Sequence, residues 1–309
     1  KNLIATPLSG FINIKIDNNF LYDYFIHFLN KPPKISHPKN ICLEYVSANP
    51  TGPLHIGHGR WAVIGDCLSR LLTKVGHNVH KEFYINDAGN QIKLFNDSIS
   101  AKKNKSEIPE NGYEGTFIDY IASKNPNNNI DFTLDYQKNT LNKLNCEFNE
   151  WFKESSLNKN NDIIDQLTKL FNEQIYKKDG ALWFKTSQFS DDKDRVILKE
   201  DGSLTYFATD ILYHINKINR KFDTLINIWG ADHHGYIKRI ESAINAQPKP
   251  IKLVVILGQL VNLFKDGEPI KMSKRSGELI ELEEVINEIG SDATRFFLVL
   301  IFLKFFHSL

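Results

Sequence analysis

Two histidines three positions apart, His55 and His58, could act together on one negatively charged group. The apolar run before them predicts a buried strand over residues 41–47, and the spacing of apolar residues after them predicts a helix over residues 59–75. A helix N-terminus attracts phosphate because its first N–H groups lack partners within the helix. Glycines such as Gly57 also let a ligand approach the backbone. We interpret the stretch as a phosphate site; exposed loop histidines or a pair of metal ligands are the alternatives.

A second motif, the string Lys271-Met-Ser-Lys-Arg275, could stabilise phosphate charge through Lys271 and Lys274. By itself it is typical of a solvated basic loop. Together with the His-Ile-Gly-His string at residues 55–58, it resembles the two signature loops of class I aminoacyl-tRNA synthetases. Three longer strings resemble the arginyl-tRNA synthetases specifically: residues 47–60, 84–91 and 229–235.

These motifs need a scaffold, and the pattern around them alternates between strands and helices. The almost wholly apolar run at residues 252–257 is typical of a central parallel strand. The pattern and the resemblance together predict an α/β fold, a doubly wound parallel-sheet nucleotide-binding domain of the class I synthetase type. The other strands are predicted over residues 10–16, 41–47, 79–84 and 225–229, and the helices over residues 18–29, 59–75, 208–218, 236–246 and 281–289 and from 292 onward.

Residues 96–200 interrupt this alternation with polar, asparagine- and lysine-rich loops. An apolar stripe from Leu134 to Trp151 predicts one helix, and residues 162–176 predict another. Short strands are predicted near the end of the block. The block resembles the α+β insertion that class I synthetases carry between the two halves of their nucleotide-binding fold.

The resemblance divides the chain into three parts. Residues 1–30 would be the end of an N-terminal add-on domain, and residues 31–290 the class I catalytic domain, with its insertion at about residues 96–200. Residues 291–309 would be the start of a truncated C-terminal helical region. The apolar run at residues 296–309 departs from the family, which turns polar there, and would promote aggregation if it were exposed.

The composition of the chain argues against several classes of protein. With 38 basic and 37 acidic residues among 309, the net charge of +1 does not indicate general nucleic-acid binding, so a tRNA partner would need a local basic patch. Three cysteines without C-x-x-C spacing argue against a structural zinc site and favour a reduced compartment. No apolar run approaches the roughly 20 residues of a membrane span, and no secretory signal is present. We therefore expect a cytoplasmic protein without a membrane partner.

The resemblance implies a two-step reaction with ATP and Mg²⁺, L-arginine and tRNA(Arg) as substrates and partners, carried out by a monomer. The arginine carboxylate would attack the α-phosphorus of ATP, and the arginyl group would then pass to the 3′ end of the tRNA. Catalysis would come from positioning and from stabilising phosphate charge. The residues expected to do this are His55, His58, Lys271 and Lys274.

Recognition of a planar guanidinium calls for carboxylates. Asp210 is the first candidate and Glu44 the second, because a glutamate within the apolar run at residues 41–46 is costly unless it is paired. The resemblance adds further substrate-binding residues, Ser47, Asn49, Tyr206 and His234, and residues on the ATP side, Gly57, Gly230, Asp232 and His233.

Two questions about the site stay open at this level. The resemblance does not decide which of His233 and His234 contacts the substrate. Adjacent histidines on a turn seldom reach the same ion, and no third ligand is evident, so no metal ligands are expected among the protein's residues.

Two other readings of the chain compete with a ligase. One is a nucleotidyltransferase of the same superfamily that activates a small acid without tRNA, although the insertion and the lysine motif argue against it. The other is a catalytically incomplete fragment that binds ATP or arginine without aminoacylation. Exchange of pyrophosphate into ATP, with and without tRNA, would separate the three.

Overall fold

The computed structural model of the chain describes residues 3–158, 163–258, 263–265, 268–270 and 280–306. The strands are β1 (Leu3–Leu8), β2 (Phe11–Ile16), β3 (Asn40–Glu44), β4 (Asn78–Ile85), β5 (Glu150–Lys153), β6 (Ile175–Lys178), β7 (Ala181–Phe184), β8 (Arg195–Leu198), β9 (Thr224–Gly230), β10 (Lys252–Gly258), β11 (Leu263–Lys265) and β12 (Glu268–Ile270). The α-helices are α1 (Asn18–Asn30), α2 (Ile56–Val75), α3 (Asn90–Asn104), α4 (Thr116–Lys124), α5 (Asn129–Lys143), α6 (Ile163–Leu170), α7 (Tyr206–Asn219), α8 (Ile237–Asn245), α9 (Leu282–Ile289) and α10 (Ser291–Phe306).

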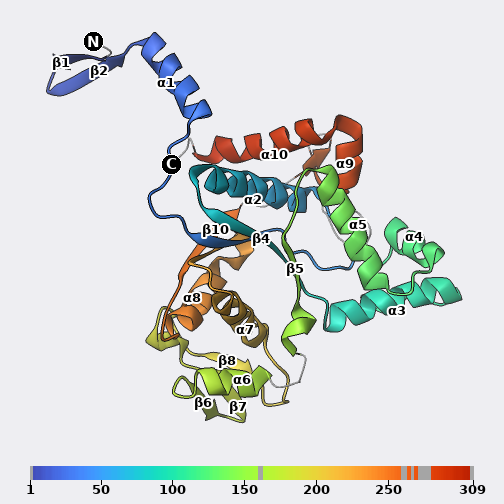
Figure 1. Ribbon diagram of the computed structural model, residues 1–309. Coiled ribbons are helices and arrows are strands. Elements are labelled where there is room, and N and C mark those ends of the chain that lie inside the picture. Colours follow the sequence, from blue (N-terminus) through green and yellow to red (C-terminus); the bar gives the residue numbers. More distant parts are fainter. Residues whose placement is uncertain (1–2, 159–162, 259–262, 266–267, 271–279, 307–309) are drawn as a thin grey trace.

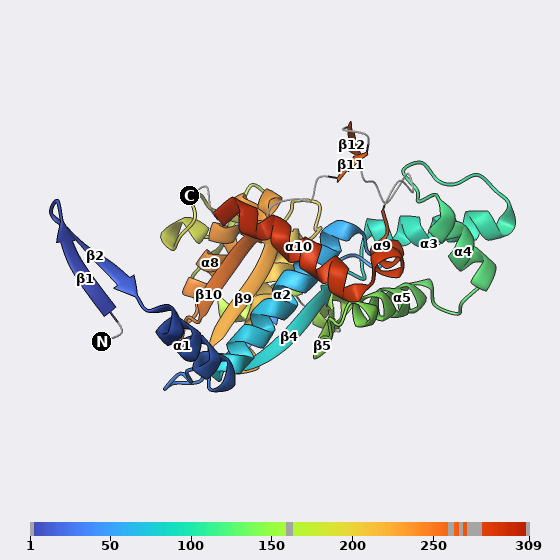
Figure 2. The same ribbon diagram turned by 90° about the horizontal axis from the view of Figure 1, so that it is seen from above.

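A parallel sheet with the strand order β10-β9-β3-β4-β5 forms the centre of the molecule. Helices α2 and α10 cover one face and α7 and α8 the other (Figures 1 and 2). Alternation along β3 explains this, because Ile41, Leu43 and Tyr45 pack in the same core cluster as Trp61 of α2, whereas Cys42 packs with the residues of α7 and α8. The predicted doubly wound α/β architecture is confirmed.

Two details of the sheet differ from the sequence prediction. Strand β10 lies at the edge of the described sheet and not at its centre, since it pairs only with β9 there. The strand is apolar because both of its faces pack against core side chains. This packing does not indicate whether another strand pairs with each of its edges. Strand β5 pairs with β4, so residues 150–153 belong to the central sheet although they fall within the stretch assigned to the insertion.

Two helices predicted within residues 96–200 are shorter than expected. Helix α5 ends at Lys143, and Trp151 lies in β5, so the apolar stripe continues through a turn into a strand. Helix α6 ends at Leu170, and Ile175–Lys178 forms β6 in a small sheet with β7 and β8. Apolar spacing alone cannot show where a helix stops when the next element buries the same face of the chain.

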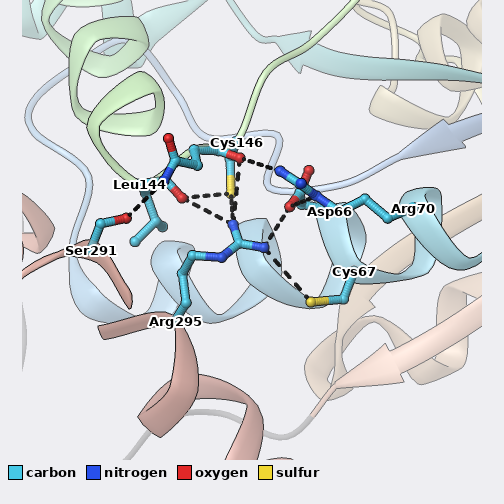
Figure 3. A network of polar contacts seen from close by, with 8 residues as sticks. Asp66, Cys67, Arg70, Leu144, Cys146, Ser291 and Arg295 are labelled. Carbon is cyan, nitrogen blue, oxygen red and sulfur yellow. Dashed lines mark hydrogen bonds and ion pairs between the residues drawn. The ribbon is translucent and has the colours of Figure 1, made fainter. Parts of the chain in front are cut away.

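Arg295 of α10 ties the last helix to the core (Figure 3). One terminal nitrogen donates to the Asp66 carboxylate of α2 at 2.6 Å, and the other donates to the carbonyl oxygen of Leu144 at 3.0 Å. Arg70 donates to the same Asp66 oxygen at 2.8 Å. The Asp66 side chain is 2% exposed, so this buried carboxylate is compensated by two guanidinium groups.

The hairpin β1–β2 and helix α1 extend away from the rest of the molecule in both views (Figures 1 and 2). None of the α1 residues is buried, and several of its aromatic side chains are exposed. Among the described helices, none is both long and apolar enough to cross a bilayer.

Candidate active site

The chain turns sharply as it leaves β3, just before the histidine motif. Val46 and Ser47 both adopt left-handed backbone conformations, with φ of 72° and 49°, which are costly for residues that have a Cβ. Hydrogen bonds hold this turn. The Ser47 hydroxyl donates to the Glu44 carboxylate at 3.0 Å and accepts from the backbone N–H of Tyr84 at 3.2 Å. The turn thus fixes the end of β3 against the end of β4.

His55 and His58 form a capping box at the N-terminus of α2. Nδ1 of His55 accepts from the backbone N–H of Gly57, and Nδ1 of His58 accepts from the backbone N–H of His55, both at 3.1 Å. Their rings lie 3.7 Å apart. Because each Nδ1 accepts a hydrogen bond, a neutral ring carries its proton on Nε2. The pair therefore presents N–H donors beside the positive end of a 20-residue helix, which suits an anion.

A cavity of about 340 Å³ lies at the carboxyl ends of the strands. This volume falls in the usual range for small-molecule sites, and the position at the strand ends is where open α/β sheets bind ligands. It brings together eight of the residues predicted from the sequence: Glu44, Ser47, His55, Gly57, His58, Asp210, Gly230 and His233. The sequence did not single out its aromatic lining: Trp61, Tyr84, Tyr213, Trp229 and Tyr236.

Asp210 is the carboxylate in this cavity whose charge is least compensated. It accepts a hydrogen bond from the Tyr236 hydroxyl at 2.5 Å and forms no ion pair within the described residues. Burial raises the pKa of Asp210 to about 7, the Tyr236 hydrogen bond opposes that rise, and the charges of Glu44 and Glu154 add to it. A bound cation would relieve this cost.

Glu154, which follows β5, lies beside the site in a neighbouring hollow, and the sequence did not single it out. Its carboxylate accepts from the Tyr84 hydroxyl at 2.8 Å, and Tyr84 itself lines the cavity. Burial raises the pKa of Glu154, and the hydrogen bond from Tyr84 opposes this. The residue was assigned to the insertion, so only the pairing of β5 with β4 could have placed it here.

Glu44 lies in the cavity wall, but its charge already has a partner. Lys217 of α7, fully buried, donates to Glu44 at 2.5 Å and to Oδ1 of Asn227 at 3.3 Å. Burial acts to lower the pKa of Lys217, but Glu44 raises it, and the pKa ends above its ordinary value. The predicted requirement that Glu44 be paired is therefore met from within the protein.

His214 connects this buried pair to Asp210. The side-chain amide of Asn227 must donate to Nε2 of His214 at 2.9 Å, since its oxygen accepts from Lys217. Nδ1 of His214 then donates to the backbone carbonyl of Asp210 at 2.8 Å. Burial, followed by the charge of Lys217, lowers the pKa of His214 to about 3, so the ring is neutral. The ring thus links Asn227 of the sheet to the backbone of Asp210 in α7 through two hydrogen bonds.

The remaining predicted site residues lie elsewhere. Asn49 is not part of the cavity lining, and its side chain donates to the Gln91 side chain at 2.6 Å. Tyr206 is 73% exposed and lines a neighbouring hollow with Glu154. His234 lines a different hollow between α8 and residues 191–195, so the structure brings His233 to the cavity and not its neighbour.

Three further predicted residues have no side-chain description. Asp232 lies in the short turn after β9, within Ala231–Tyr236. Lys271 and Lys274 lie outside the described residues. Within the described residues, no group of three or more histidine, cysteine, aspartate or glutamate side chains is arranged to hold a metal ion.

Comparison with known proteins places this geometry in a family. Residues 25–124 and 117–297 match the family model for the catalytic domain of class I tRNA synthetases (R). The arginine–tRNA ligase of Listeria monocytogenes serotype 4b is 43% identical over 326 residues, which covers 95% of this chain and 58% of that protein. The corresponding ligase of Staphylococcus epidermidis is 42% identical and 59% covered. The chain thus spans rather more than half the length of these curated relatives.

Solved structures agree. A crystal structure from Campylobacter jejuni assigned to arginyl-tRNA synthetase is 39% identical with a TM-score of 0.77, covering 92% of this chain and 68% of that one. The arginyl-tRNA synthetase of Thermus thermophilus has a TM-score of 0.72 at 18% identity, covering 95% and 62%, and shows likeness of fold alone. From the family match, the level of identity and the shared fold, this chain belongs to the arginyl family of class I tRNA synthetases.

Proposed function

We propose that this chain holds the adenylate-forming site of an arginine–tRNA ligase, which activates L-arginine with ATP and transfers it to the 3′ end of tRNA(Arg). One observation carries the proposal: a carboxylate without an ion-pair partner among the described residues, Asp210, shares a cavity with a helix N-terminus capped by His55 and His58. A cation and a phosphate can therefore bind side by side.

Asp210 would face the substrate guanidinium from the cavity wall, and Glu154, which lines the neighbouring hollow, would act on it from behind Tyr84. The hydroxyl of Tyr84 donates its proton to Glu154, so the lone pairs of the same oxygen are left to accept from an N–H group in the cavity. The charge of Glu44 is compensated by Lys217, so Glu44 would shape the cavity wall but would not form the main ion pair with the substrate. Of the residues that the family resemblance suggests for the polar groups of the amino acid, Ser47 lines the cavity, whereas Asn49, Tyr206 and His234 are not part of its lining.

ATP would place its phosphates over the start of α2, where the Nε2 donors of His55 and His58 stabilise the charge that moves onto pyrophosphate. Gly57, Gly230, Asp232 and His233 would border the nucleotide, and Lys271 and Lys274 would act from the second motif. Mg²⁺ would arrive with ATP, because phosphate oxygens are the hard ligands it prefers.

The chemistry balances without a covalent enzyme intermediate. An oxygen of the arginine carboxylate forms a bond to the α-phosphorus as the bond to pyrophosphate breaks. A ribose hydroxyl of the tRNA then attacks the arginyl carbonyl carbon, and AMP leaves. The protein's task is to align these atoms and to stabilise charge.

The test is exchange of labelled pyrophosphate into ATP by this chain, with L-arginine, with or without tRNA(Arg). We expect exchange that needs arginine and tRNA together. L-citrulline, which has the same shape without the positive charge, should give none. Asp210→Asn should raise the KM for arginine by roughly 100-fold, because it removes a charge-assisted hydrogen bond worth about 3 kcal/mol.

Asp165→Asn is the matched control, since Asp165 is an exposed aspartate on α6 away from the cavity. It should leave the exchange rate unchanged. Exchange with another amino acid would contradict the arginine assignment. Binding of ATP without exchange under any condition would instead favour the second candidate, a chain that binds ATP or arginine without aminoacylation.

A further inference from the structure

The loop between β3 and α2 is buried although it has no regular structure. Ala48, Thr51 and Leu54 are each less than 5% exposed. Pro50 and Pro53 have no N–H group, so the loop cannot form a ladder of its own hydrogen bonds. Buried backbone carbonyls must nevertheless find donors, because leaving them unpaired costs free energy. The donors must come from outside the loop.

Gln137 of α5 supplies two of them. Its side-chain nitrogen donates to the carbonyl oxygen of Asn49 at 3.1 Å and to that of Gly52 at 2.8 Å. The side chain is fully buried. The opposite orientation of the amide would set its oxygen against both carbonyls, so the hydrogen-bond pattern fixes which end is nitrogen. One side chain is thereby hydrogen-bonded to the loop at two positions.

The neighbouring residue on α5 holds the other side of the same loop. The Tyr136 hydroxyl donates to the Glu281 carboxylate at 3.2 Å. Glu281 lies opposite His55 in an antiparallel bridge. Two backbone hydrogen bonds close that bridge, from the N–H of Ile56 to Ile280 and from the N–H of Leu282 to Leu54. Helix α5 therefore contacts the loop directly and through its bridge partner.

We propose that Gln137 is a positioning residue, which holds the loop carrying Asn49 in register with His55 and His58. The role rests on the proposed function, since it serves arginine activation without touching a reacting atom. The expected effect is large for so indirect a contact, because a displacement of about 1 Å in an active-site element can cost roughly 100-fold in rate.

The test is Gln137→Met, which keeps the volume of the side chain and removes both donated hydrogen bonds. Its matched control is Thr133→Val, because Thr133 is also a fully buried polar residue on α5, but its hydroxyl donates to Asn129 within the same helix. In the pyrophosphate exchange assay, Gln137→Met should lose about 10- to 100-fold in kcat/KM for arginine. Thr133→Val should stay within about twofold. Equal losses in both variants would overturn the proposal.

A second measurement does not depend on catalysis. Backbone amide hydrogen exchange over residues 48–54 should be faster in Gln137→Met than in wild type, and unchanged in Thr133→Val. If wild type itself shows no pyrophosphate exchange, the proposed function is what fails, and amide exchange alone decides the positioning role. Identical amide exchange in the two variants would then overturn that role.

Discussion

Two aspartates of this protein lie in polar networks with opposite balances of charge. Asp66 on α2 accepts from both Arg70 and Arg295, so its negative charge is more than compensated (Figure 3). Asp210 on α7 is buried and accepts from a neutral hydroxyl, and the charges of Glu44 and Glu154 nearby outweigh that of Lys217, which pairs with Glu44. The first network is complete as it stands, whereas the second has an excess of negative charge.

The difference separates a stabilising role from a binding role. A buried carboxylate with two guanidinium partners holds secondary-structure elements together. Removing it would leave the guanidinium groups without their counter-charge. A carboxylate that is buried without an ion-pair partner, with other carboxylates nearby, raises the free energy of the empty protein, and a bound cation lowers it again. Substitution of the two aspartates by asparagine should therefore change stability in opposite directions.

Asp66→Asn should have the largest effect. It leaves the Arg295 guanidinium partly buried without its counter-charge, and we expect a loss of about 3–5 kcal/mol in the free energy of unfolding. Urea denaturation measures this. Asp292→Asn, an exposed aspartate one turn before Arg295, should change stability by less than about 1 kcal/mol. Similar losses in both variants would show that the compensated charge at Asp66 is not what matters.

Asp210→Asn should stabilise the ligand-free protein by about 1–3 kcal/mol at pH 8. The pKa of Asp210 is near 7 in the folded state and near 4 when unfolded, so the folded protein binds the extra proton between these values. Wild-type stability therefore falls as pH rises from 4 to 7, and the gain from the substitution should vanish near pH 4. A variant that is less stable than wild type at pH 8 would refute the excess of negative charge.

Arg295→Lys should cost about 1–2 kcal/mol. A single ammonium cannot reach both Asp66 and the Leu144 carbonyl as the guanidinium fork does. Arg70→Lys is the comparison, because the Arg70 side chain is 64% exposed and an exposed pair contributes under about 1 kcal/mol. Thermal unfolding of the two variants side by side ranks the contacts, and a larger loss at Arg70 would reverse the assignment.

Tyr236→Phe should have the smallest effect, and on binding only. The Tyr236 hydroxyl lowers the pKa of Asp210, so its removal leaves more of the carboxyl protonated at neutral pH. Arginine affinity, measured by calorimetry from pH 6 to pH 9, should be roughly threefold to tenfold weaker at pH 7 and should approach the wild-type value as the pH rises. A uniform loss at every pH would mean that Tyr236 contacts the ligand directly.

The sequence predicted the parts of the fold that rest on local pattern. Strand β3, helix α2 and the histidines at the start of α2 follow from apolar spacing and from glycines and prolines at fixed positions. Strand β5 was missed because Glu150–Lys153 is short, and its partner is more than 60 residues away in the chain. Tertiary pairing decided its structure, and no local signal records that pairing.

The candidate site shows the same limit. Residues within recognisable strings, such as His55 and His58, could be found and do line the cavity. Lys217 could not, because a lysine seven positions after Asp210 resembles any solvated helix residue until Glu44 is seen beside it. Gln137 could not be found from the sequence either, because its role depends on two hydrogen bonds to the backbone of a loop more than 80 residues earlier in the chain.

The order of strands also determines when this protein can fold during synthesis. Strand β3 pairs with β9, and the N–H of Asn40 donates to the Asp223 side chain 183 positions later. Until the ribosome has made β9, one edge of β3 has no neighbour in the sheet, and such edges invite pairing with other chains. Contacts so distant in sequence slow folding. Nascent chains that stop before residue 224 should therefore depend on chaperones more than longer ones do.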